Sequence, residues 1–83
     1  MEKYLIEIDL PAAGIKYDML VPELMQVGTL TSLAASVLSK LSKGMYTASP
    51  YSVLCERGSG MQFDRTLRLR DTPIRNGTRL ILY

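Results

Sequence analysis

The side chains best suited to chemistry in this 83-residue chain are arginines, carboxylates and one cysteine. The chain has no histidine, and the single thiol of Cys55 cannot assemble a metal site from cysteine ligands. Imidazole-based metal centres and nucleophilic sites that use a histidine base are thereby excluded. We expect no enzyme, no cofactor and no metal ion, and we expect Cys55 to be a small buried hydrophobic residue in a reducing compartment.

One short segment has the composition of a catalytic site. Asp64 and Asp71 flank Arg65, Arg68 and Arg70, as an acid–base pair beside an anion clamp would. Nothing in the sequence predicts the burial that would shift the pKa of either carboxyl group. A solvated loop is therefore the favoured interpretation of this segment.

The charge of the chain is unevenly distributed. Residues 1–44 hold four lysines and five acidic residues, whereas residues 45–83 hold six arginines and three acidic residues. A basic half of this kind is typical of nucleic-acid-binding surfaces, but only Phe63 and Tyr83 lie near enough in sequence to stack on bases. Binding of nucleic acid through the C-terminal arginines is thus the alternative function, and a solvated surface is favoured over it.

Alternating hydrophobicity at the start of the chain predicts two β-strands. In residues 3–10 the even-numbered side chains are apolar, and in residues 15–21 the odd-numbered ones are. Pro11 and Gly14 between them favour a tight turn, so we predict a hairpin with these apolar residues facing the core. The opposite face of the first strand carries Leu5, Glu7 and Asp9.

From residue 29 the apolar residues recur with the spacing of an α-helix. Thr29 is the predicted N-cap, residues 30–43 are the predicted helix, and Gly44 suits the left-handed position that follows it. The apolar stripe expected to pack on the sheet consists of Leu30, Leu33, Ala34, Val37, Leu38 and Leu41.

The remaining predicted strands are shorter. Residues 51–56 and 78–83 alternate again, and residues 61–63 are expected to form a very short additional strand. The core-facing residues of these segments are expected to be Tyr51, Val53, Cys55, Leu80 and Leu82. Strands of this kind and one amphipathic helix together predict an α+β fold with one sheet packed on one helix.

This order of elements, with the segment LRDTPIRNGTRL from Leu69 to Leu80, resembles the ubiquitin-like β-grasp fold. The resemblance covers nearly the whole chain and implies a single ubiquitin-like domain, residues 1–83. It implies a mixed four- to five-stranded sheet on one helix, with the strands in the order 2-1-5-3. Conjugated carriers of this fold end in a flexible Gly-Gly tail, whereas this sequence closes on Leu82-Tyr83, which implies a non-conjugated module.

Within this superfold the chain is most similar to the YukD/EsaB-type accessory proteins of bacterial type VII secretion systems. The similarity extends to chain length and to Tyr17-Asp18-Met19. It implies a cytoplasmic adaptor whose partner is a protein, namely a cytosolic part of a secretion-system membrane subunit, and it leaves a homo-oligomer open. A related domain begins a membrane subunit of actinobacterial systems, so an excised domain stays open, although Met1 and Tyr83 favour a complete protein. No membrane insertion is expected, because no apolar run approaches about 18 residues.

The predicted strand phases turn one apolar side chain of each strand away from the helix. In the implied strand order these residues align across neighbouring strands and form a contiguous apolar patch, which is typical of an interaction site. The expected partner-binding residues are Leu5, Leu20, Leu54, Ile81 and Tyr83.

Overall fold

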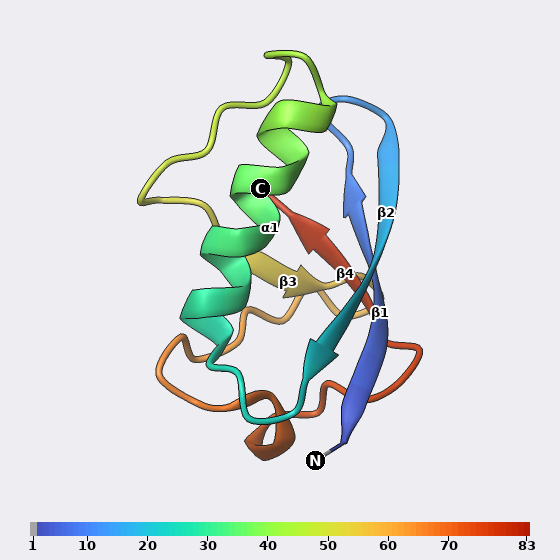
Figure 1. The fold of residues 1–83 in the computed structure, drawn as a ribbon, viewed down its shortest axis with the longest axis vertical. Helices are drawn as coiled ribbons and strands as arrows, with labels where there is room; N and C mark the ends of the chain where they lie inside the picture. The colour runs from blue at the N-terminus through green and yellow to red at the C-terminus, as the bar shows by residue number, and fades with distance from the viewer. Residues whose placement is uncertain (1) are drawn as a thin grey trace.

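The computed structural model describes residues 2–83, and Figure 1 shows one helix lying across one face of a sheet. The strands are β1 (Lys3–Leu10), β2 (Ile15–Pro22), β3 (Leu54–Glu56) and β4 (Arg79–Leu82). The helix α1 spans Val27–Leu41, and a single 3-10 turn, η1, spans Leu69–Asp71. The predicted α+β class, a mixed sheet packed on one helix, is confirmed.

The sheet has the order β2-β1-β4-β3, so the last strand of the chain lies between the first and the third. β1 pairs antiparallel with β2, while β4 pairs in parallel with β1 and antiparallel with β3. This is the order 2-1-5-3 that the resemblance implied, with the last strand numbered β4 here because residues 61–63 form no strand. The additional strand expected at residues 61–63 is reduced to an isolated bridge between Gln62 and Cys55, which leaves four strands in the described chain.

The core lies between α1 and the sheet. The even-numbered residues of β1 are buried, as the alternation predicted, and Leu80 and Leu82 of β4 are buried beside them. The helix and the loops that follow β3 complete the core with Val27, Leu30, Ala34, Leu38, Phe63, Leu69 and Ile74.

The start of α1 lies before the predicted one, and a distant loop satisfies its first N–H groups. The Val27 N–H donates to the Leu67 carbonyl, and the Gly28 N–H donates to the Arg65 carbonyl, both at 2.9 Å. Thr29 therefore lies inside the helix and is not its N-cap. Backbone carbonyls replace the side-chain oxygen that usually caps such donors, so no capping residue is needed at this end.

The predicted apolar stripe of α1 is only partly buried. Leu33 is 41% exposed and Leu41 is 47% exposed, whereas Thr31 and Ala35 are buried. The small side chain of Ala35 and the Thr31 hydroxyl, which donates to the Val27 carbonyl at 2.8 Å, let the helix roll toward that side. The helix ends at Leu41, before the predicted Lys43, and Gly44 has the predicted positive φ.

The predicted phase of the strand at residues 51–56 is wrong. Leu54 is 2% exposed and lies opposite Leu82, so it faces α1, whereas Cys55 lies opposite Ile81 on the other face. Val53, Leu54 and Cys55 are all apolar, and either phase would therefore offer the core an apolar residue. Pairing with β4 decides between the two phases.

We expect Leu54→Ala to lower the free energy of unfolding by about 2–4 kcal/mol, because it removes a buried side chain and leaves a cavity. Leu41→Ala is the matched control: Leu41 is half exposed, and its truncation should cost less than about 1 kcal/mol. Urea denaturation of the three proteins measures both values. Equal costs for the two variants would contradict the strand phase described here.

Candidate protein-interaction surface

The outer face is the side of the sheet that α1 leaves uncovered, and it is built on Leu5, Glu7 and Asp9 of β1 and the residues opposite them. Directly opposite residues project to the same side of a sheet, so the register fixes its rows. At one end Leu5 lies opposite Leu20, and these side chains are 48% and 61% exposed. This apolar pair faces solvent.

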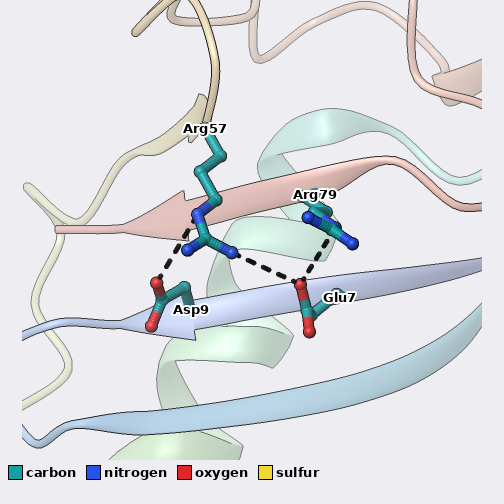
Figure 2. A network of polar contacts seen from close by, with 4 residues as sticks. All are labelled: Glu7, Asp9, Arg57 and Arg79. Atoms are coloured by element: carbon teal, nitrogen blue, oxygen red, sulfur yellow. Dashed lines mark ion pairs between the residues drawn. The ribbon is translucent and has the colours of Figure 1, made fainter.

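A row of charges follows this pair along β1. Glu7 lies between Asp18 of β2 and Arg79 of β4. Figure 2 shows Arg57, which follows β3, reaching across β4 toward Glu7 and Asp9. Its Nη1 lies 3.7 Å from Glu7 Oε2 and its Nε lies 4.0 Å from Asp9 Oδ2, while Arg79 Nε lies 3.5 Å from the same Glu7 oxygen.

Glu7 Oε2 is the most constrained atom of this row. It is inaccessible to solvent and accepts no hydrogen bond from residues 2–83, so the guanidinium groups of Arg57 and Arg79 are what compensate its charge. Distances of 3.5 Å or more make these contacts ion pairs and not hydrogen bonds. Two arginines opposite Glu7 and Asp9 leave the centre of the outer face without a large net charge.

A second apolar group lies beyond the charges. Ile81 lies between Asp9 of β1 and Cys55 of β3, and it is half-buried. Tyr83 continues the same side of β4 and exchanges two backbone hydrogen bonds with Val53, at 3.0 and 3.2 Å. Its side chain is 60% exposed, so this end of the outer face also offers an apolar surface.

The predicted partner-binding residues therefore do not align in one row. Leu5 and Leu20 stand at one end of the outer face and Ile81 and Tyr83 at the other, with the charged row between them. Leu54 is not on this face, because it belongs to the core. The sequence turned Glu7 and Asp9 outward, but nothing in it indicated that Arg57 would reach them from beyond β3.

A shallow hollow adjoins the charged row at the β3 end. It is lined by Glu56, Arg57 and Arg79, which carry charges of both signs, and by the uncharged Gly58 and Thr78. Among residues 2–83, no group of three potential metal ligands occurs, and no helix has the length and hydropathy needed to cross a membrane.

Four of the six C-terminal arginines contact other groups of the folded chain. Arg57 and Arg79 pair with the carboxylates of β1. Two others are held by backbone carbonyls: Arg65 Nη1 donates to the Ser52 carbonyl at 3.2 Å, and Arg75 Nη1 donates to the Thr72 and Ile74 carbonyls. Arg75 also lies over the ring of Tyr4, 5.9 Å from its centroid. These guanidinium groups serve the fold.

The segment with the composition of a catalytic site is an exposed turn. Asp64 Oδ1 accepts hydrogen bonds from the Thr66 N–H (2.9 Å) and the Thr66 hydroxyl (2.7 Å), and these bonds lower the pKa of the Asp64 carboxyl. A carboxyl held in its ionised form is a poor proton donor near neutral pH. Asp71, Arg68 and Arg70 are exposed on the same stretch, which agrees with the solvated loop that the sequence favoured.

Comparison with known proteins identifies the architecture. No protein-family model and no curated protein sequence matches the chain. The ubiquitin-like domain of EccD5 from Mycobacterium xenopi superposes with a TM-score of 0.80 at 15% identity, over 100% of this chain and 94% of that one. The chain has the ubiquitin-like β-grasp fold.

Two further structures share this β-grasp fold. The ubiquitin-like domain of the Mycobacterium tuberculosis type VII secretion system protein ECCD1 matches with a TM-score of 0.73 at 19% identity, over 99% of this chain and 98% of that one. A chain of the MycP5-free ESX-5 inner membrane complex matches with a TM-score of 0.82 at 16% identity, over 100% of this chain. Here the β-grasp domain spans only 21% of the neighbouring chain. Identities this low establish the fold alone.

The ion pairs of the outer face predict an unequal response to two arginine substitutions. Arg57→Ala should lower the free energy of unfolding by about 1–2 kcal/mol, because it leaves the inaccessible Glu7 oxygen with one partner and removes the partner of Asp9. Arg79→Ala is the control: its side chain is 69% exposed, and its loss should cost less than about 0.5 kcal/mol. Denaturant titrations at low and high salt measure both, and a larger effect of Arg79→Ala would contradict this account of the row.

Proposed function

We propose that this chain is a non-catalytic protein-interaction module that docks a partner on its outer face. The observation that carries the proposal is the arrangement of that face: exposed Leu5 and Leu20 at one end, Ile81 and Tyr83 at the other, and paired charges between them. Apolar anchors supply most of the free energy of a protein interface, and the charges select the partner.

The partner in this proposal is a cytosolic part of a membrane subunit of a type VII secretion system. Two features support this placement: the resemblance of the sequence to YukD/EsaB-type accessory proteins, and the fold shared with the ubiquitin-like domains of EccD5 and ECCD1. The module would then act in the cytoplasm as an adaptor. It would bind by non-covalent docking of a preformed surface.

The paired charges restrict which partners can cover the outer face. Covering Glu7, Asp9 and Arg57 removes water from ionised groups, and that desolvation is costly unless the partner supplies polar groups in register. A purely apolar partner is therefore disfavoured. We expect the partner segment to carry apolar residues at both ends and polar or charged residues between them.

Calorimetric titration with the separately produced cytosolic domains of the secretion-system membrane subunits tests the proposal. Tyr83→Ser and Leu5→Ser should each weaken binding by about 1–2 kcal/mol, because each removes an apolar anchor from the interface. Both side chains are largely exposed, so the melting temperature should change little.

Tyr51→Ser is the matched control for Tyr83→Ser. Tyr51 is 89% exposed and lies in the loop before β3, in no strand of the sheet, so its replacement should leave binding unchanged. Wild-type affinity in both outer-face variants would remove this face as the docking site. Co-purification of salt-sensitive nucleic acid, lost in Arg68→Glu and Arg70→Glu, would instead support the alternative function.

A further inference from the structure

Strand β2 lies at an edge of the sheet, and the hydrogen bonds of β1 identify which backbone groups of β2 have no partner strand. The Glu7 N–H donates to the Thr78 carbonyl, and the Leu5 carbonyl accepts from the Gly77 N–H, so the odd-numbered residues of β1 bond toward β4. The even-numbered residues of β1 consequently bond to the odd-numbered residues of β2. The N–H and carbonyl groups of Lys16, Asp18 and Leu20 therefore point to the side of β2 where no strand pairs with it. Figure 1 shows β2 at this edge of the sheet.

These free groups restrict how a second β2 strand can pair with this one. In an antiparallel pair of identical strands, even-numbered residues must lie opposite even-numbered residues for the free groups to meet. Centring the pair on Tyr17 places Lys16 opposite the Asp18 of the other copy, and symmetry repeats the match. The neighbouring registers place Lys16 opposite Lys16 or Asp18 opposite Asp18, which is unfavourable.

The register centred on Tyr17 also matches the apolar side of the strand. It places Ile15 opposite Met19 and Tyr17 opposite Tyr17 on the face toward the helix, where all three side chains are half-buried. The ladder would run from Gly14 to Leu20 and stop at Pro22, which has no N–H to donate.

The helix adds apolar surface next to this edge. Gly28 marks the flank of α1 that faces the Arg65 loop, since an ideal Cβ on Gly28 would lie 3.2 Å from the Arg65 carbonyl oxygen. Ala35 lies two turns further along the same flank and is buried. Leu33 and Val37 lie on the opposite flank, because successive residues turn by 100° around a helix. Figure 1 shows the loop after β3 on one side of α1 and β2 on the other, so this flank is the one nearer β2. Leu33 on it is 41% exposed.

We propose that two copies of this chain form a dimer by antiparallel pairing of their β2 strands, centred on Tyr17. The two sheets become one continuous sheet of eight strands. Both helices lie on the same side of it, and the flanks that carry Leu33 and Val37 cover the joined strands. The dimer leaves Ile81 and Tyr83 free, so it does not depend on the docking function proposed above.

Charge reversal at two positions tests the register. Lys16→Asp or Asp18→Lys alone turns both symmetric pairs into like charges and should raise the dimer dissociation constant about tenfold or more. The double variant Lys16→Asp/Asp18→Lys restores opposite charges in the same register and should return the constant to near the wild-type value. Sedimentation equilibrium over a wide concentration range measures all four proteins, and the far-ultraviolet circular dichroism of each reports whether it folds.

Amide hydrogen exchange gives a second and independent readout of the interface. In a dilute sample the N–H groups of Lys16, Asp18 and Leu20 should exchange fast, since no partner protects them. In a concentrated sample these three should become protected, while Tyr17 and Met19, already bonded to β1, should change little. This alternation within one strand is specific to pairing at the edge.

Three results would overturn the proposal. A chain that stays monomeric up to about millimolar concentration leaves the β2 edge to another occupant or to none. A dimer whose dissociation constant ignores both single charge reversals uses another face. A double variant as weak as the single ones shows that Lys16 and Asp18 do not face one another. Failure of the docking titration above would leave each of these outcomes unaffected.

Discussion

The parallel pairing of β4 with β1 is the contact on which the rest of the structure depends. The turn just before β4 meets the start of β1, since the Leu5 N–H donates to Asn76 Oδ1 at 2.8 Å, 71 positions away, and the Gly77 N–H donates to the Leu5 carbonyl at 2.7 Å. Parallel strands need a long connection, and α1 is part of it. The helix covers one face of the sheet only, so the other face consists of the side chains that the strands turn away from the helix. The same pairing brings Arg79 beside Glu7 and thereby creates the charged row.

Local sequence patterns predicted the long elements and failed on the short one. Eight alternating residues in each of β1 and β2 define a phase that no neighbour can reverse, so the hairpin and its outward Leu5 and Leu20 followed from the sequence. β3 has three residues, and an alternation needs more than that to be read. Its phase is set by the pairing of Leu54 with Leu82. The two residues are far apart in the sequence, so a local pattern cannot predict this contact. For this reason one of the five expected partner-binding residues, Leu54, belongs to the core.

The helix shows the same division between local and tertiary causes. Its existence and its place in the chain followed from the 3.6-residue period, whereas its first residue and its rotation did not. The carbonyls of Arg65 and Leu67 extend its N-terminus to Val27, and the packing of Ala35 turns Leu33 outward. The first effect comes from the loop after β3, which has no periodicity of its own, and the second from tertiary packing of the helix. The sequence did not predict the charged row for a related reason. Arg57 lies in a turn, and only the folded structure brings that turn close to Glu7 and Asp9.

In a sheet with a helix on one face only, the uncovered face and the free edge are both able to associate with other proteins without selectivity. Here position-specific charge restricts both. On the outer face, Glu7, Asp9 and Arg57 separate two apolar groups that would otherwise merge into one patch. At the edge, Lys16 and Asp18 disfavour pairing in the two neighbouring registers, as charged residues on edge strands do, and become complementary in the register centred on Tyr17. Affinity on either surface would come from apolar contact, but the choice of partner and register comes from where the charges stand. A substitution that keeps every apolar residue and moves one charge would therefore alter recognition more than it alters the fold.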